Sequence, residues 1–416
     1  MVITKRDGRK ADFNKDKIKI AVLKAFIDVD GEETAYAKEK ARDIANYIES
    51  LDKDMSVEDV QDVVEAKLMA SNRKDVAKAY IIYRNNRTTV RERNTQMMRD
   101  ISEKLSAKNV QNQNANVDEK SFGGRVGEAS DAVLKKYALD NCMSEMAKNN
   151  HLNNEIYVHD LNSYAVGMHN CLSIPFDKLL ANGFNTRQTD VRPANSVNTA
   201  FQLVAVIFQL QSLQQFGGVA ATHIDWTMIP YIRKSFYKHY IDGMRYLENV
   251  NIEEIIEKSD GFTFDDTTSI DDEIYKENEK TYQYAMDMTI KETQQAVEGM
   301  YHNLNTLQSR SGNQLPFTSI NYGTCTLPEG RMVIKALLEG SIKGVGKFRK
   351  TSIFPCGIFQ MMKGVNREPN DPNYDLYKLA LKSTAQRLYP NYANVDWSGN
   401  AGYDRNDPQT YFSTMG

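Results

Sequence analysis

The segment from Tyr157 to Cys171, which reads YVHDLNSYAVGMHNC, holds the side chains best suited to chemistry. It combines two imidazoles, His159 and His169, with the thiol of Cys171. Its mixture of apolar residues and a glycine predicts a strand that delivers this cysteine into an interior, where it would act as a reactive thiol. The alternative interpretation is a small buried hydrophobe, because free cysteine is among the most buried residue types.

A second chemical cluster lies at the N-terminus, around the turn that Asp7-Gly8 predicts. Its cations are Lys5, Arg6, Arg9, Lys10, Lys15 and Lys17. Clustered cations beside a glycine turn suit a polyphosphate. On spacing alone, however, a solvated basic face is the simpler interpretation.

Other classes of site are disfavoured by the spacing of residues. Cys142, Cys171, Cys325 and Cys356 form no C-x-x-C pair, so we expect no structural zinc site and no disulfide framework within this chain. The G-x-x-x-x-G-K signature of a P-loop is absent. The acidic run 253–273 lacks calcium-loop spacing, and we interpret it as a solvated loop.

Length and composition indicate a globular protein of two or three domains. The chain has 416 residues, of which 41% are hydrophobic and 26% charged, with a formal net charge of -3. No global basic field would draw it to nucleic acid or anionic lipid. Neither a membrane span nor a signal peptide is present in the sequence, so we expect a cytoplasmic protein without direct nucleic-acid or membrane partners.

The elements that would position these residues fall into two parts. Residues 1–93 predict a small α+β domain, a strand pair followed by four amphipathic helices, with a capping box at Ser56 and Asp59. Residues 94–116 are polar and predict an exposed linker. Residues 117–416 predict an α/β domain, because strand, helix and strand alternate in its later part.

The helix predicted from about Asn195 to Phe216 is apolar over more than half of its circumference. A helix this apolar is buried, either in a core or in a subunit interface. Its five glutamines slightly favour the interface, and therefore a homodimer. Gly217-Gly218 would end this helix.

The N-terminal motif T-K-R-D-G-R, followed by F-N-x-D-K-I, resembles the ATP-cone, a nucleotide-sensing regulatory module of ribonucleotide reductases. The resemblance implies ATP or dATP as allosteric effectors. It places Lys5, Arg6, Asn14 and Lys17 at nucleotide-contacting positions. Ala11 departs from cones that carry a carboxylate there.

The rest of the chain resembles the anaerobic, class III ribonucleoside triphosphate reductases. The motifs are N-x-N-V-D-E-K-S-F-G-G-R at 114–125, V-H-D-L at 158–161, H-N-C at 169–171, F-G-G-V-A at 216–220 and F-S-T-M-G at 412–416. The resemblance implies the first part of a ten-stranded α/β barrel of the glycyl radical enzyme type. In it, Cys171 would be the second, substrate-facing cysteine that assists loss of the 2′ hydroxyl. Near the substrate would lie His169, Asn170, Ser413, Met415 and Gly416.

In that family the radical-bearing cysteine follows S-T-M-G directly, so it would come one residue after Gly416. The glycyl radical and a four-cysteine zinc site would also lie in the C-terminal part. We therefore expect the N-terminal half of a reductase for ribonucleoside triphosphates, arising from a split or intein-interrupted gene or from a fragment. Activity would require the C-terminal part and a radical-SAM activase, and the isolated chain would be inactive.

The alternative function is a non-catalytic protein that senses ATP or dATP through the cone. A relative of the formate lyases shares the barrel, but the cone and the F-S-T-M-G motif disfavour it.

Overall fold

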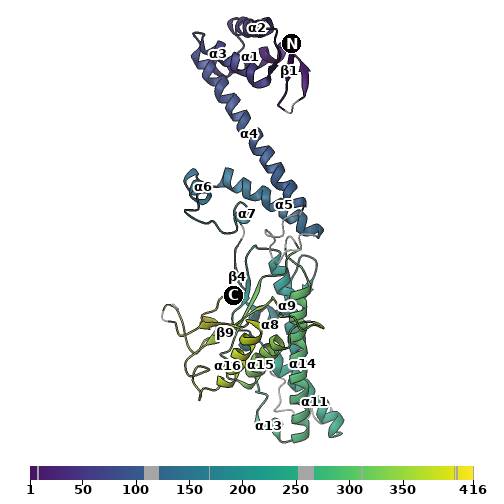
Figure 1. The fold of residues 1–416 in the computed structure, drawn as a ribbon. Coiled ribbons are helices and arrows are strands. Elements are labelled where there is room, and N and C mark those ends of the chain that lie inside the picture. The colour runs from purple at the N-terminus through teal and green to yellow at the C-terminus, as the bar shows by residue number, and fades with distance from the viewer. Residues whose placement is uncertain are drawn as a thin grey trace. The chain divides into compact units, whose positions relative to one another are not determined.

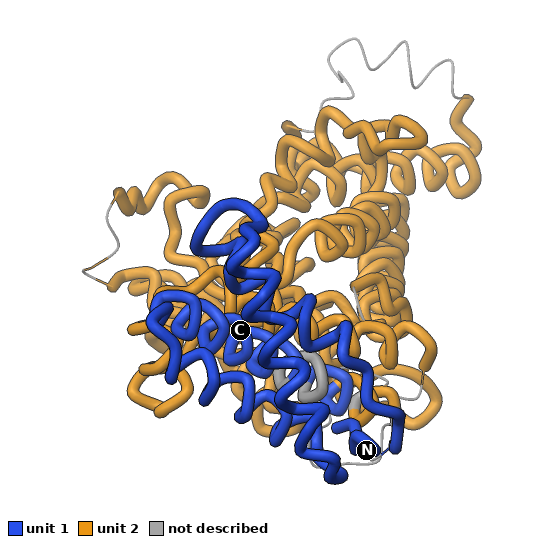
Figure 2. Tube along the Cα trace, turned by 90° about the horizontal axis from the view of Figure 1, so that it is seen from above, with its two compact units in different colours: residues 1–100 blue, residues 101–416 orange. Residues whose placement is uncertain are grey.

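The computed structural model describes residues 1–416 except 7–8, 107–120, 168, 252–266, 311–312, 398, 400–401 and 416, with backbone alone at 92–96, 104 and 106. The chain divides into two compact units, Met1–Asp100 and Ile101–Gly416 (Figure 2). No helix in the described ranges is long and apolar enough to cross a membrane.

The first unit is the predicted α+β domain. Its elements are β1 (Val2–Thr4), β2 (Lys10–Asp12), α1 (Lys15–Asp30), α2 (Ala35–Ser50), β3 (Met55–Ser56), α3 (Val57–Met69) and the start of α4 (Lys74–Ser106). β1 pairs antiparallel with β2, which confirms the predicted strand pair, and parallel with β3. The turn predicted at Asp7-Gly8 lies outside the described residues.

The core of this unit follows from helical periodicity. Val22 and Phe26 on α1 pack with Ile44 and Ile48 on α2, because residues four apart share one face of a helix. The predicted capping box is confirmed: Asp59 N–H donates to Ser56 Oγ at 3.1 Å, and Ser56 N–H donates to Asp59 Oδ2 at 2.9 Å. Each bond satisfies a donor that the first turn of α3 leaves free.

The polar composition of 94–116 predicts an exposed linker, and α4 continues through its first part as far as Ser106. The division between the two units, at Asp100, falls inside this range. Residues 107–116 are not described, so the extent of the linker remains a prediction.

The second unit is built on a parallel sheet. Its strands are β4 (Leu172–Ser173), β7 (Val219–Ala221), β8 (Thr318–Tyr322), β9 (Cys356–Met361) and β10 (Asn391–Asn394). They lie in the order β10-β9-β8-β7-β4, with every pair parallel. Figure 1 labels β4 and β9 of this sheet among the helices of the unit. The predicted α/β class is confirmed, whereas a barrel of ten strands stays a prediction.

Helices connect these strands, and a small two-stranded ribbon lies apart from the sheet. The longer helices are α5 (Phe122–Tyr137), α9 (Val197–Ser212), α11 (Ile229–Leu247), α14 (Glu279–Thr306), α15 (Pro328–Lys343) and α16 (Tyr374–Arg387). The shorter ones are η2 (Ala138–Cys142), α6 (Glu145–Leu152), α7 (Leu161–Tyr164), α8 (Phe176–Asn182), α10 (Ile224–Thr227), α13 (Glu273–Lys276) and η3 (Pro408–Thr410). The ribbon pairs β5 (Phe184–Asn185) with β6 (Asp190–Val191).

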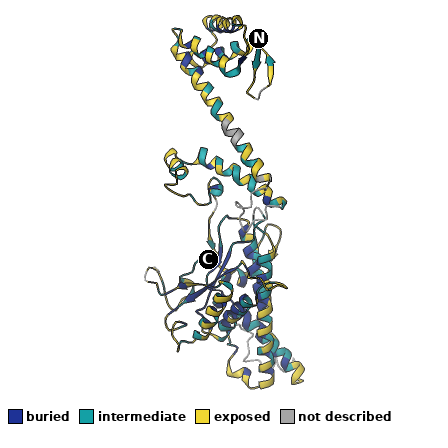
Figure 3. Ribbon diagram, viewed as in Figure 1, coloured by how far each residue is buried: buried dark blue, intermediate teal, exposed yellow. Residues whose placement is uncertain are grey.

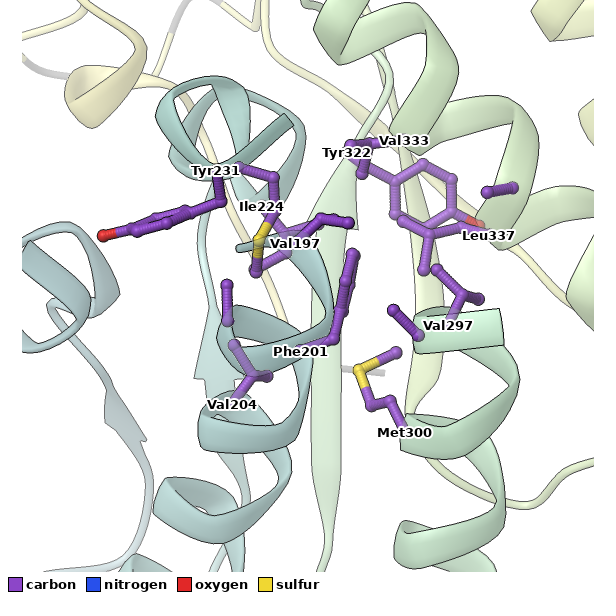
Figure 4. Close-up of a cluster of buried hydrophobic side chains, with 14 of the residues drawn as sticks. Val197, Phe201, Val204, Ile224, Tyr231, Val297, Met300, Tyr322, Val333 and Leu337 are labelled. Carbon is purple, nitrogen blue, oxygen red and sulfur yellow. The ribbon is translucent and has the colours of Figure 1, made fainter. Parts of the chain in front are cut away.

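The core lies between the sheet and these helices. Phe201 on α9 is fully buried and points toward Met300 on α14, next to Tyr322 of β8 (Figure 4). Buried residues lie along the strands of the sheet and on the inward sides of the helices (Figure 3). The predicted apolar helix is confirmed as α9. Most of its buried residues pack in the hydrophobic core of this chain.

The prediction of a strand through 157–171 is wrong. Asp160 and Gly167 adopt left-handed backbone conformations, with φ of 51° and 69°, and α7 occupies the middle of the segment. Strand pairing begins only at Leu172, where β7 lies alongside. Cys171 precedes this pairing and is exposed rather than delivered into an interior.

Candidate functional site

One face of the parallel sheet carries three buried polar side chains among apolar ones. Ile320 and Tyr322 of β8 and Phe359 of β9 point into the apolar core, so alternation places Ser319, Asn321 and Gln360 on the opposite side. We call this opposite side the polar face. Ser319, Asn321 and Gln360 are all buried, which requires that their amides and hydroxyl find partners.

Cys171 lies at the edge of this sheet, immediately before β4. Its Sγ accepts the backbone N–H of Gly218 at 3.2 Å and donates to Asn170 Oδ1 at 3.4 Å. Leu172 N–H in turn donates to Gly218 O at 3.1 Å. The residue before β7 therefore holds both the thiol and the first residue of β4.

Gln215 fixes the turn that carries Gly218. Its Nε2 donates to Gly218 O at 2.7 Å and to Asn170 O at 3.4 Å. A β-carbon at Gly217 would lie 2.0 Å from Asn170 O, so only glycine allows this approach. The F-G-G-V-A motif thus packs directly against H-N-C.

The segment Phe412–Met415, which we call the tail, lies across the polar face. Thr414 N–H donates to Asn321 Oδ1 at 3.1 Å, and Asn321 Nδ2 donates to Thr414 O at 3.0 Å. Met415 lies beside Gly218, since a β-carbon there would be 3.4 Å from Met415 Sδ. Cys171 and Met415 therefore contact the same glycine.

The remaining predicted residues around Cys171 are placed as follows. His169 and Asn170 are exposed, and Ser413 is partly buried within the tail. Gly416 lies outside the described residues. The structure thus brings Cys171, Asn170 and Met415 together around Gly218, whereas the His169 side chain makes no hydrogen bond, ion pair or ring contact within the described ranges.

Arg310 is a cation that lies near this site and that the sequence did not indicate. Its guanidinium is 3.8 Å from the centre of the Phe317 ring, and Phe317 O accepts the N–H of Val219 at 2.8 Å. Burial lowers the pKa of Arg310, although the charges of Asp160 and Cys171 oppose this effect. Arg310 therefore interacts electrostatically with Asp160 and Cys171.

A hydrogen-bonded chain lies beyond the other end of β7. Thr222 Oγ1 lies 2.7 Å from His223 Nδ1, and His223 Nε2 lies 2.7 Å from Asp177 Oδ2. Thr227 donates to the second oxygen of Asp177. Burial raises the pKa of Asp177, but the bonds from His223 and Thr227 outweigh it and the pKa is lowered.

Asp225 fixes the loop that follows β8. Its carboxylate is fully buried and accepts the N–H groups of Gly323, Thr324 and Cys325 at 2.9, 3.1 and 3.0 Å. Burial raises the pKa of Asp225 despite these bonds. The carboxyl group therefore holds the loop at the carboxyl end of the sheet, where α/β proteins place ligands.

In the first unit, the four predicted nucleotide contacts have different surroundings. Arg6 pairs with Glu58 and donates to Gln61 Oε1 at 3.0 Å. Asn14 Oδ1 caps α1 by accepting the N–H groups of Asp16 and Lys17. Lys5 and the Lys17 side chain are exposed.

Arg84 joins Arg6 at the same carboxylate. It contacts Glu58 at 2.8 Å, Asp62 at 2.6 Å and Glu65 at 2.9 Å. The bonds from Arg6 and Arg84 lower the pKa of Glu58. A phosphate that bound Arg6 would have to compete with this carboxylate.

A cavity of about 440 Å³ opens between α1 and α2 of the same unit. Its lining includes Lys19, Lys38 and Arg42, and none of the four predicted nucleotide contacts. Across the described ranges, no cluster of three or more His, Cys, Asp or Glu side chains could hold a metal ion.

The sequence did not indicate Asn321, Gln360 or Arg310 as site residues. Each lies far along the chain from Cys171, and no short motif connects them. Gly217 and Gly218 lie within the F-G-G-V-A motif. Two adjacent glycines are a sequence signal for a close approach of another backbone segment, here that of Asn170.

The fold and site define an α/β protein with an exposed thiol at the edge of a parallel sheet and a separate α+β module. The family model "Anaerobic ribonucleoside-triphosphate reductase" matches residues 113–416, and the ATP cone domain matches residues 1–89. The chain belongs to the anaerobic ribonucleoside-triphosphate reductase family, as its motifs predict. An ATP cone implies binding of a nucleotide effector.

Curated relatives agree with this assignment. The anaerobic ribonucleoside-triphosphate reductase of Haemophilus influenzae is 30% identical over 399 residues, covering 95% of this chain and 52% of that protein. The Escherichia coli enzyme of the same name is 29% identical over 397 residues, covering 95% and 51%. The chain therefore spans about half the length of these relatives.

Among solved structures, one similar to this chain is the anaerobic ribonucleotide reductase from Thermotoga maritima in complex with dATP and CTP. The match has 13% identity and a TM-score of 0.48, and it covers 73% of this chain and 48% of that chain.

Proposed function

We propose that this chain is the regulatory and substrate-binding part of an anaerobic ribonucleoside triphosphate reductase. The observation that carries the proposal is the meeting of H-N-C and the tail at Gly218. Two motifs about 240 residues apart in sequence, each expected near the substrate, contact the same glycine.

In this proposal the radical-bearing cysteine, which the family places directly after S-T-M-G, would take the 3′ hydrogen of the ribose as a thiyl radical and later return it. Cys171 would assist loss of the 2′ hydroxyl as water, and an external reductant, formate or a redoxin, would supply the two electrons with which hydrogen replaces that hydroxyl. The N–H of Gly218 orients Sγ, and Gln215 holds that N–H in place. The glycyl radical of the family supplies the oxidising equivalent that starts the reaction.

The zinc site and the glycyl radical of this proposal belong to the half of the relatives' length that this chain does not span. Its own four cysteines do not fit a zinc site, because Cys142 and Cys171 are exposed while Cys325 and Cys356 are buried, and no described group gathers them. The C-terminal reductase part and a radical-SAM activase are the proposed partners.

The first unit supplies the effector site for ATP or dATP. Arg6, Lys5 and Lys17 would contact the phosphates, since guanidinium and ammonium groups are the usual phosphate donors. Asn14 Oδ1 already caps α1, so its Nδ2 would make the nucleotide contact.

A homodimer is also part of the proposal, with the end of α9 as its contact. Most of α9 is buried within this chain, but Leu210 and Leu213 are 39% and 58% exposed. Leu213→Glu should weaken self-association in sedimentation velocity without unfolding the chain. An unchanged dissociation constant would exclude α9 as the contact.

The central test reconstitutes the chain with the C-terminal part of a related reductase and its activase. Deoxyribonucleotide product should form with the native chain and fall to background with Cys171→Ala, while calorimetric ATP binding stays unchanged. Cys142→Ala, at another exposed cysteine, is the matched control and should retain activity. Product formation by Cys171→Ala at the native rate would refute the proposed role of this thiol.

A further inference from the structure

Two buried side-chain amides connect the tail to β7 and to the residue that follows it. Asn321 on β8 and Gln360 on β9 are both 0% exposed. Asn321 Nδ2 donates to Ala221 O at 2.9 Å and to Thr414 O at 3.0 Å. Gln360 Nε2 donates to Thr222 O at 3.3 Å and to Phe412 O at 3.0 Å.

The two amides thus repeat one arrangement. Each uses both of its N–H donors to bridge a carbonyl at the end of β7 to a carbonyl of the tail. At the end of β7 the bridged carbonyls belong to the consecutive residues Ala221 and Thr222. In the tail they belong to Phe412 and Thr414, as expected when an extended segment presents every second carbonyl to one side. The tail is therefore held as an additional extended segment by side chains instead of by a strand ladder.

The arrangement gives the tail a defined direction. Phe412 is held beside Thr222, Thr414 beside Ala221, and Met415 beside Gly218. The chain consequently runs from the carboxyl end of β7 toward the residue that donates to Cys171 Sγ.

The two amides differ in one respect. Asn321 also accepts the N–H of Thr414 at 3.1 Å, so two of its three hydrogen bonds go to the tail and the third goes to Ala221 O of β7. Gln360 Oε1 is buried, and within the described residues it has no hydrogen-bond partner. Asn321 should therefore contribute more than Gln360, because removing it takes away both hydrogen bonds to Thr414 as well as the bond to Ala221 O.

We infer that Asn321 and Gln360 are positioning residues that hold the tail across the polar face and thereby set its distance from Cys171. This inference rests on the proposed function, in which the radical-bearing cysteine follows the S-T-M-G motif that ends the tail. Neither amide contacts Cys171, so both act through the backbone of the tail. Loss of either should slow turnover without weakening nucleotide binding.

The first experiment measures hydrogen exchange of the complete chain by mass spectrometry or NMR. In Asn321→Ala, the Thr414 amide should exchange at least about tenfold faster, because the side-chain oxygen that accepts its N–H is removed. The amides of Leu172 and Val219, which donate to Gly218 O and Phe317 O, should keep their native rates. Gln360→Ala should give a smaller increase at the tail.

Asn373→Ala is the matched control. Asn373 is also 0% exposed, and its Nδ2 donates to Gly323 O and Cys325 O, away from the tail. It should leave the exchange of Thr414 unchanged. If Asn321→Ala does not fold, Asn321→Asp keeps the shape and the acceptor but removes both donors, and it serves as the second variant.

The second experiment traps the geometry as a disulfide. In a Cys142→Ser background, Met415→Cys should cross-link to Cys171 under mild oxidation, since both residues contact Gly218. Adding Asn321→Ala should slow cross-linking by about tenfold, whereas adding Asn373→Ala should not. Equal rates in both backgrounds would overturn the inference.

The third experiment measures turnover of the reconstituted reductase. Asn321→Ala should lower kcat at least about tenfold with an unchanged KM for the nucleotide, while Asn373→Ala retains kcat. A native kcat in Asn321→Ala would overturn the positioning role even if exchange responds. If the native reconstituted enzyme gives no product, the proposed function fails, and exchange and cross-linking still decide whether the amides hold the tail.

Discussion

Cys171 Sγ accepts the backbone N–H of Gly218 at 3.2 Å. This bond joins the start of β4 to the start of β7 and places a thiol where the tail also makes contact. The preceding residue, Gly217, packs against the backbone of Asn170, where a β-carbon would lie 2.0 Å from Asn170 O. A β-carbon at Gly218, in contrast, would meet only ordinary van der Waals contacts, the nearest to Met415 Sδ. Alanine substitutions at the two glycines should therefore differ in their effect on stability.

Gly217→Ala should destabilise the second unit by about 1–3 kcal/mol, because its β-carbon would lie 2.0 Å from Asn170 O. Gly218→Ala should cost less than about 1 kcal/mol, since the nearest atom to its β-carbon is Met415 Sδ at 3.4 Å. Urea unfolding followed by tryptophan fluorescence measures both, because Trp226 and Trp397 lie in the second unit. Equal losses in the two variants would contradict the geometry.

Asp225→Asn should change how stability depends on pH. Burial raises the pKa of Asp225 in the folded chain, so its favourable contribution is present below the unfolded pKa of about 4 and is lost as the pH rises. The native chain should therefore lose stability relative to Asp225→Asn between pH 4 and pH 7 in urea unfolding. A constant difference across this range would show that the folded pKa is not raised.

Asp177→Asn should show the opposite dependence. Burial raises the pKa of Asp177, but the hydrogen bonds from His223 and Thr227 have the larger effect, and the folded pKa is lowered. The stabilisation of the fold by this carboxylate is therefore present above pH 4 and is lost as the pH falls. At pH 7 the variant should lose about 1 kcal/mol, a modest value because the side chain is 34% exposed. The same urea experiment at pH 3.5 should bring the two proteins closer together, and a widening gap would refute this assignment.

Glu58→Gln should strengthen binding of ATP to the first unit by about threefold. The carboxylate pairs with both Arg6 and Arg84, and its removal frees Arg6 for a phosphate. Isothermal calorimetry on the complete chain measures the effect. Asp62→Asn, which removes a partner of Arg84, is the control. Equal strengthening in both variants would exclude competition at Arg6.

Native-state alkylation should separate the four cysteines into two pairs. Cys142 and Cys171 are exposed and should react within minutes, whereas Cys325 and Cys356 are buried and should react at least about a hundredfold more slowly. Burial also raises the pKa of both buried thiols, which lowers their thiolate fraction. Peptide mass mapping identifies each site, and rapid labelling of Cys325 would contradict the packing of the loop after β8.

Where a feature depends on neighbouring residues, the sequence sufficed to predict it. The helices of the first unit, the capping box at Ser56 and the apolar helix α9 follow from periodicity and short-range hydrogen bonding. The motifs also identified the family. The strand predicted up to Cys171 failed, because pairing requires a neighbouring strand that the local pattern cannot reveal.

The position of Cys171 and of the tail was decided only by the tertiary structure. Asn321 and Thr414 are 93 residues apart, and nothing in the sequence around Thr414 indicates that its backbone binds a side-chain amide. The same holds for Gly218 and Cys171, whose contact depends on the parallel alignment of β4 and β7. The sequence by itself determined which residues could do chemistry, and the pairing of distant strands decided which of them meet.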